Sequence, residues 1–121
     1  MIFISSVKDI DINQYDEVWY ITNNNPNMRV GCQHHKELAP FIGDYMKYRQ
    51  GSLPLIELLN RYGQDLWSGK YNEAIDELIY ESRQDKWIQL VCYCDNYEEC
   101  HRSILYRYLE AKYPNDVVLL D

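Results

Sequence analysis

The pattern of apolar and polar positions along the chain predicts alternating strands and helices. Short apolar runs rich in β-branched and aromatic residues indicate strands, and apolar residues at helical spacing indicate helices. The segment between residues 28 and 37 fits neither pattern, and we expect a loop there with at most a short strand. The predicted strands are residues 1–5, 17–22, 87–93 and 117–120, and the predicted helices are approximately residues 40–50, 54–66, 71–84 and 100–112.

The order of these elements predicts the fold class. The strand–helix–strand unit at the end of the chain predicts a parallel pair of strands joined by a right-handed crossover. The chain has 121 residues, of which 46% are hydrophobic, and this length and composition are typical of one globular domain. No internal repeat or linker divides it. We therefore predict a single compact α/β domain over residues 1–121, with a small, mostly parallel sheet flanked by helices.

The overall charge limits the partners that the protein can attract. The formal net charge is −7, which opposes long-range attraction to nucleic acid or to an anionic membrane, although a local basic pocket remains compatible with it. The apolar start, residues 1–6, is too short for a signal peptide or a membrane span. We therefore expect a cytoplasmic protein that does not enter membranes, with reduced cysteines.

The segment 92–102 carries the strongest chemical signal. An apolar strand ends at a Cys-x-Cys, a polar loop follows, and Cys-His-Arg opens a helix. Side chains alternate along a strand, so Cys92 and Cys94 lie on one face. The helix N-terminus directs unpaired N–H groups and a partial positive charge back toward the end of the strand. The side chains expected to meet at this strand-to-helix turn are those of Cys92, Cys94, Cys100, His101 and Arg102.

One hypothesis is a ligand pocket with a reactive thiol. Either Cys94 or Cys100 would be the nucleophile, because a helix N-terminus and a nearby cation lower the pKa of a thiol. His101 would act as a general acid or base. Arg102 would hold a nucleotide, a nucleic acid or another anionic ligand. Cys92 would lie beside that ligand. The Cys94–Arg102 spacing is longer than in phosphatase or rhodanese loops, so neither of those activities is predicted.

Two other hypotheses remain open for the same chain. The thiols and the imidazole of segment 92–102 are zinc ligands by type, although a Cys-x-Cys and an adjacent Cys-His fit one tetrahedral centre poorly. Alternatively, the turn is structural, and the protein binds a protein partner through an acidic, tyrosine-rich surface, as a nucleic-acid mimic would. The chain has twelve tyrosines, which suit either packing or an interface.

A second candidate segment lies upstream. Cys32, His34 and His35 follow one another closely, and the two histidines would line the pocket if this loop folds over the end of the strand. The sequence carries no glycine-rich phosphate loop or other cofactor fingerprint. We therefore predict no cofactor and assign no metal site.

The motif also resembles a known family. Leu-Val-Cys-Tyr-Cys, a short loop and Cys-His-Arg followed by Leu105 resemble the C-terminal signature of the domain-of-unknown-function 488 family, with closest similarity to its small phage and bacterial members. Glu37-Leu38-Ala39-Pro40 and the stretch 58–62 resemble upstream parts of that group, so the resemblance covers residues 38–112. It implies a compact α/β fold and a site in segment 92–102, but no reaction, and whether the chain is an enzyme stays open. The acidic loop of Asp95, Glu98 and Glu99 departs from the expected pattern and counts against phosphate binding.

Overall fold

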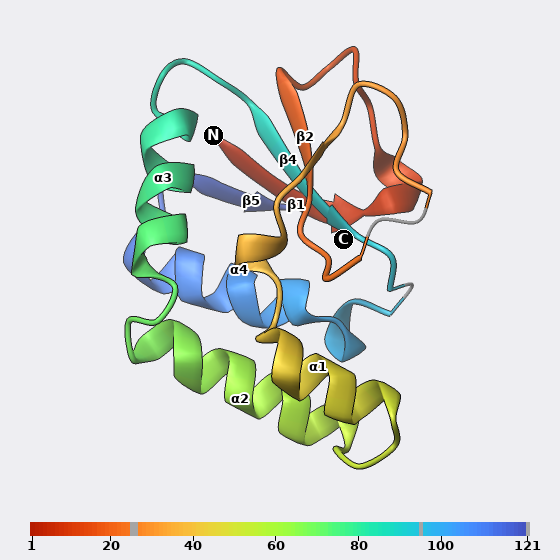
Figure 1. Ribbon diagram of the computed structural model, residues 1–121. Helices are drawn as coiled ribbons and strands as arrows, with labels where there is room; N and C mark the ends of the chain where they lie inside the picture. Colours follow the sequence, from red (N-terminus) through yellow and green to blue (C-terminus); the bar gives the residue numbers. More distant parts are fainter. Residues whose placement is uncertain (25–26, 95, 121) are drawn as a thin grey trace.

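The computed structural model describes residues 1–24, 27–94 and 96–120. Its centre is a five-stranded sheet in which every pairing is parallel, with the strand order β3-β2-β4-β1-β5 (Figure 1). The predicted single α/β domain is confirmed, and the sheet is entirely parallel over the described residues. The strands are β1 (Ile2–Ser6), β2 (Glu17–Tyr20), β3 (Gln33–His34), β4 (Ile88–Cys92) and β5 (Val117–Leu119).

The final strand–helix–strand unit differs from the expectation in one respect. β4 and β5 both run parallel to the rest of the sheet, but they do not pair with each other, because β1 lies between them and pairs with both. The side chains of Ile2 and Ile4 on β1 are fully buried. An apolar strand of this kind gains most from a position inside the sheet, whereas β5 at the edge exposes part of Val118.

Four helices pack against the sheet and build its main core on one face. Alternate strand residues such as Ile4, Trp19 and Leu90 point into this core and meet Leu78 and Leu105 from the helices. Figure 1 shows α4 between the sheet and α2, with α1 beside α2. The helices are α1 (Ile42–Arg49), α2 (Leu55–Trp67), α3 (Asn72–Ser82) and α4 (His101–Lys112).

The opposite face of the sheet has a smaller apolar cluster. Val18, Tyr20 and Val91 point to this side, where loop residues including Tyr15 and Cys32 pack against them. Side chains alternate along a strand, so Val91 and Cys92 face opposite layers. Cys32 is therefore separated by the sheet from the core layer that holds Cys92 and Cys100.

The buried Tyr62 and the half-buried Tyr71 hold the chain that leads into α1. Tyr62 on α2 donates a hydrogen bond to the carbonyl oxygen of Leu38 at 2.5 Å, and the hydroxyl of Tyr71 donates to the carbonyl oxygen of Ala39 at 2.7 Å. These bonds anchor the segment before α1 against α2 and the start of α3. As a result α1 stands beside the carboxyl ends of β2 and β4, the edge at which open α/β sheets bind ligands.

Candidate functional site

Three thiols meet at the carboxyl end of β4. Cys92 is the last residue of this strand, Cys94 follows two positions later, and Cys100 is the N-cap of α4. Their Sγ atoms all lie within 4.8 Å of one another. Cys92 and Cys100 are each 1% exposed, whereas Cys94 is exposed. The structure thus builds one cluster, here called the thiol cluster, with a single exposed member.

The thiol cluster favours a negative charge on one sulfur. Hydrogen bonds from Cys92 and Cys94 to the Cys100 sulfur lower the pKa of Cys100 far below its ordinary value, with a smaller contribution from His101 and opposition from burial. The bond to Cys100 raises the pKa of Cys94 to about 11 and raises that of Cys92 well above its ordinary value. Protons therefore leave the cluster as a whole rather than from three separate thiols.

His101 is held in a defined tautomer beside this cluster. Its Nε2 lies 2.5 Å from the carbonyl oxygen of Ile21, and its Nδ1 lies 3.9 Å from Sγ of Cys100. A carbonyl oxygen only accepts hydrogen bonds, so Nε2 carries the hydrogen and Nδ1 is directed at the thiol. The ring of Tyr62 packs edge-on against the imidazole at 5.6 Å. His101 can therefore exchange a proton with Cys100.

Arg102 supports the cluster from inside the protein. Its side chain is fully buried, and Nη1 donates to the carbonyl oxygen of Cys94 at 2.8 Å and to Sγ of Cys92 at 3.5 Å. The guanidinium also lies over the ring of Tyr97 at 5.7 Å. These contacts tie the chain after β4 to the first turn of α4. A contact between Arg102 and a ligand stays a prediction from the sequence.

A pocket of about 540 Å³ opens beside the thiol cluster. Cys92, Cys94 and His101 line it, and Arg49 contributes from the end of α1. The other lining residues are Thr22, Asn23, Asn24 and Asn27 after β2, Pro40, Tyr45 and Tyr48 on or before α1, Leu55, Leu58 and Leu59 on α2, and Tyr93 and Glu99 around the motif. Sequence reasoning missed the α1 residues. The spacing of positions 45, 48 and 49 predicts one helix face, but nothing in it indicates that this face meets the motif.

The family model named DUF488-N3a, the active DUF488-N3 subclade, matches residues 29–113. The chain belongs to the domain-of-unknown-function 488 family. The resemblance drawn from the Cys-His-Arg motif is therefore confirmed, and the matched segment contains the whole thiol cluster. No curated protein and no solved structure matches the chain.

The histidines of the upstream segment lie apart from the cluster in this DUF488 member. His34 contacts the carbonyl oxygen of Thr22 through Nε2 at 2.6 Å. His35 stacks on Trp19 with ring centroids 3.6 Å apart and contacts Glu37 through Nδ1 at 2.6 Å. Neither histidine lines the pocket beside the cluster. A ligand-binding role for these two residues stays a prediction.

The same three sulfurs are the group best placed to hold a metal ion in the described part of this DUF488 member. Tetrahedral zinc with Zn–S bonds of about 2.3 Å places its sulfur ligands about 3.8 Å apart, so the Cys92, Cys94 and Cys100 side chains would need only a small contraction. Nδ1 of His101 is the nearest nitrogen that could complete a fourth position.

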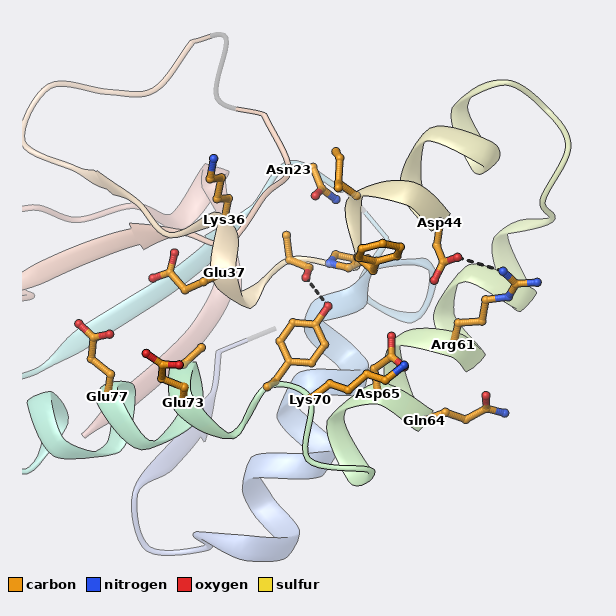
Figure 2. A pocket seen from close by; sticks show the side chains of 16 residues that line it. Asn23, Lys36, Glu37, Asp44, Arg61, Gln64, Asp65, Lys70, Glu73 and Glu77 are labelled. Atoms are coloured by element: carbon orange, nitrogen blue, oxygen red, sulfur yellow. Dashed lines mark hydrogen bonds and ion pairs between the residues drawn. The ribbon is translucent and has the colours of Figure 1, made fainter.

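A larger cavity of about 910 Å³ adjoins the first and shares Asn23 and Pro40 with it. Figure 2 shows the ion pair of Arg61 and Asp44, whose Nη1 and Oδ1 lie 2.9 Å apart across its wall. Lys70 forms a similar ion pair with Asp65. No cysteine or histidine of the described residues lines this cavity, whereas Cys92, Cys94 and His101 line the smaller pocket. The described helices include none long and apolar enough to cross a membrane.

Proposed function

We propose that this DUF488 member is a thiol-dependent enzyme that binds a small anionic ligand in the 540 Å³ pocket, with Cys94 as the thiol that contacts it. The observation that carries the proposal is the exposed Cys94 at the wall of a pocket, with Cys100 and His101 directly behind it. The matched subclade is described as active, which favours catalysis over a purely structural motif.

The pocket walls suit a nucleotide better than a long nucleic acid. Arg49 is exposed and makes no ion pair with any residue in the described ranges, so its guanidinium is available to a phosphate or carboxylate. Tyr45 and Tyr48 offer aromatic rings 6.4 Å apart, which can contact a planar base. The net charge of −7 opposes the approach of a long polyanion. A ligand of nucleotide size is therefore our preferred class.

The proposed chemistry divides the work between two thiols. As the Cys94 sulfur forms a bond to an electrophilic centre of the ligand, the leaving group departs and the Cys94 thiol proton moves along its hydrogen bond to the Cys100 thiolate. Nδ1 of His101 faces Cys100 and can take up this proton, while the leaving group takes a proton from solvent in the open pocket. Arg102 is a positioning residue in this scheme, because it holds the Cys94 carbonyl.

Ligand protection tests the proposal on the intact protein. Adenosine monophosphate is expected to slow alkylation of Cys94 by iodoacetamide, and the Arg49→Ala variant should need about tenfold more nucleotide for the same protection, because a charge-assisted hydrogen bond contributes about 1.5–3 kcal/mol. The site of alkylation is read by peptide mass spectrometry. Arg107→Ala, which removes an exposed arginine on α4, is the matched control and should behave as the wild type. Equal protection in both variants, or none in the wild type, would contradict the proposal.

A zinc-structured module is the second candidate, and it is favoured by the proximity of the three sulfurs. Metal analysis of protein grown with added zinc separates the two functions. The thiol proposal requires that Cys94 reacts with iodoacetamide without any chelator. One equivalent of zinc, with Cys94 blocked until a chelator is added and Cys32 reactive throughout, would replace the enzyme by the zinc module.

A further inference from the structure

We infer that Cys94 is an oxidation site and that Cys100 is its resolving partner, so that a peroxide converts the thiol cluster into an internal Cys94–Cys100 disulfide. The inference rests on the proposed function in one respect, since it requires the thiols to be free of metal. It adds a modification that would switch the same site off.

The exposure of the three thiols decides where oxidation begins. Cys94 is exposed and lines the pocket, whereas Cys92 and Cys100 are each 1% exposed. A peroxide molecule therefore reaches the Cys94 sulfur before the other two. Exposure governs which thiol oxidises first, and Cys94 is the exposed member of the cluster.

The local chain geometry decides which thiol resolves the product. Only Tyr93 separates Cys92 from Cys94, so a disulfide between these two would close a short and stiff loop. Cys92 is also fixed by the pairing of β4 with β1. Five residues separate Cys94 from Cys100, which gives the backbone room to bring two sulfurs already within 4.8 Å to bonding distance.

The reaction proceeds in two balanced steps. The Cys94 sulfur attacks one oxygen of hydrogen peroxide, the O–O bond breaks, and the departing hydroxide takes the Cys94 thiol proton to form water, so that Cys94 becomes a sulfenic acid. The Cys100 thiolate then attacks the Cys94 sulfur, the S–O bond breaks, and the departing hydroxide takes a proton to form water. Peroxide is thereby reduced by two electrons, one from each sulfur. The disulfide therefore lacks both the Cys94 thiol that contacts the ligand and the Cys100 thiolate that accepts its proton.

Peroxide treatment of the reduced, metal-free protein tests the inference. In the wild type we expect an internal Cys94–Cys100 disulfide, identified by mass spectrometry of peptides prepared without reductant and reversed by dithiothreitol. The Cys100→Ser variant should instead accumulate Cys94 sulfenic acid, trapped by dimedone about tenfold more than in the wild type. Cys92→Ser should still form the disulfide.

Cys32→Ser is the control for the disulfide, because Cys32 packs on the other face of the sheet, and it should oxidise as the wild type does. A disulfide that contains Cys92, or equal dimedone trapping in the wild type and in Cys100→Ser, would overturn the inference. Nucleotide protection is measured on reduced protein without peroxide. Loss of protection would therefore refute the proposed function alone, and loss of the disulfide would refute this inference alone.

Discussion

Replacing Arg102 with alanine is expected to destabilise the protein by roughly 3–5 kcal/mol. Arg102 is fully buried, and its Nη1 satisfies the carbonyl oxygen of Cys94. The substitution leaves a cavity and removes a donor from a carbonyl in the motif. The sequence alone leaves two outcomes open for this variant: an intact fold that no longer binds ligand if Arg102 holds the ligand, or unfolding if the turn is structural. The burial of Arg102 favours a loss of stability. The measurement is the free energy of unfolding in urea.

Two further substitutions make the Arg102 result specific. Arg107→Ala removes the same side chain from an exposed position on α4 and should change the unfolding free energy by no more than about 0.5 kcal/mol. Arg102→Lys retains the charge but not the forked donor geometry, so it should fall between the wild type and Arg102→Ala. An Arg102→Ala variant as stable as Arg107→Ala would show that the buried contacts do not support the fold.

Alkylation in mildly acidic solution is expected to separate the thiol cluster from an ordinary thiol. At pH 6, iodoacetamide should modify the thiol cluster about 10–100 times faster than Cys32, because the lowered pKa of Cys100 keeps a thiolate in the cluster. Burial raises the pKa of Cys32, so its rate falls steeply as the pH falls. The alkylation rates of Cys32 and of each cysteine in the thiol cluster are followed by peptide mass spectrometry between pH 5 and pH 9.

The sign of the pH effect follows from the direction of the Cys100 shift. The pKa of Cys100 is lower in the folded state than in the unfolded state, so ionisation of Cys100 stabilises the fold. This stabilisation is fully present above the unfolded-state pKa and is lost as the pH falls through the folded-state pKa. Cys100→Ser should remove this contribution and the fast alkylation of the thiol cluster at pH 6, while Cys92→Ser should retain part of both. If every cysteine of the thiol cluster follows the Cys32 profile in the wild type, the cluster holds no stabilised thiolate.

The fold could be predicted because its elements have strong local patterns. β4 is apolar except for Gln89, and its five residues are all buried in the sheet. The apolar residues of α2 recur on one face, and Leu58, Tyr62 and Leu66 are buried there. The neighbours within the sheet could not be predicted, because the position of β1 between β4 and β5 depends on how much apolar surface each strand can bury in competition with the others.

The sequence by itself determined the fold class, the family and the position of the thiols, because 92–102 is a local strand-to-helix turn whose geometry follows from a few neighbouring residues. Only the tertiary structure decided that Cys94 is exposed while Cys100 and Arg102 are buried. It also decided that Arg49, distant in the sequence, lines the pocket. Burial and the meeting of distant segments arise from packing α2 against α4 and α1 against α2, and no local pattern of residues encodes that packing.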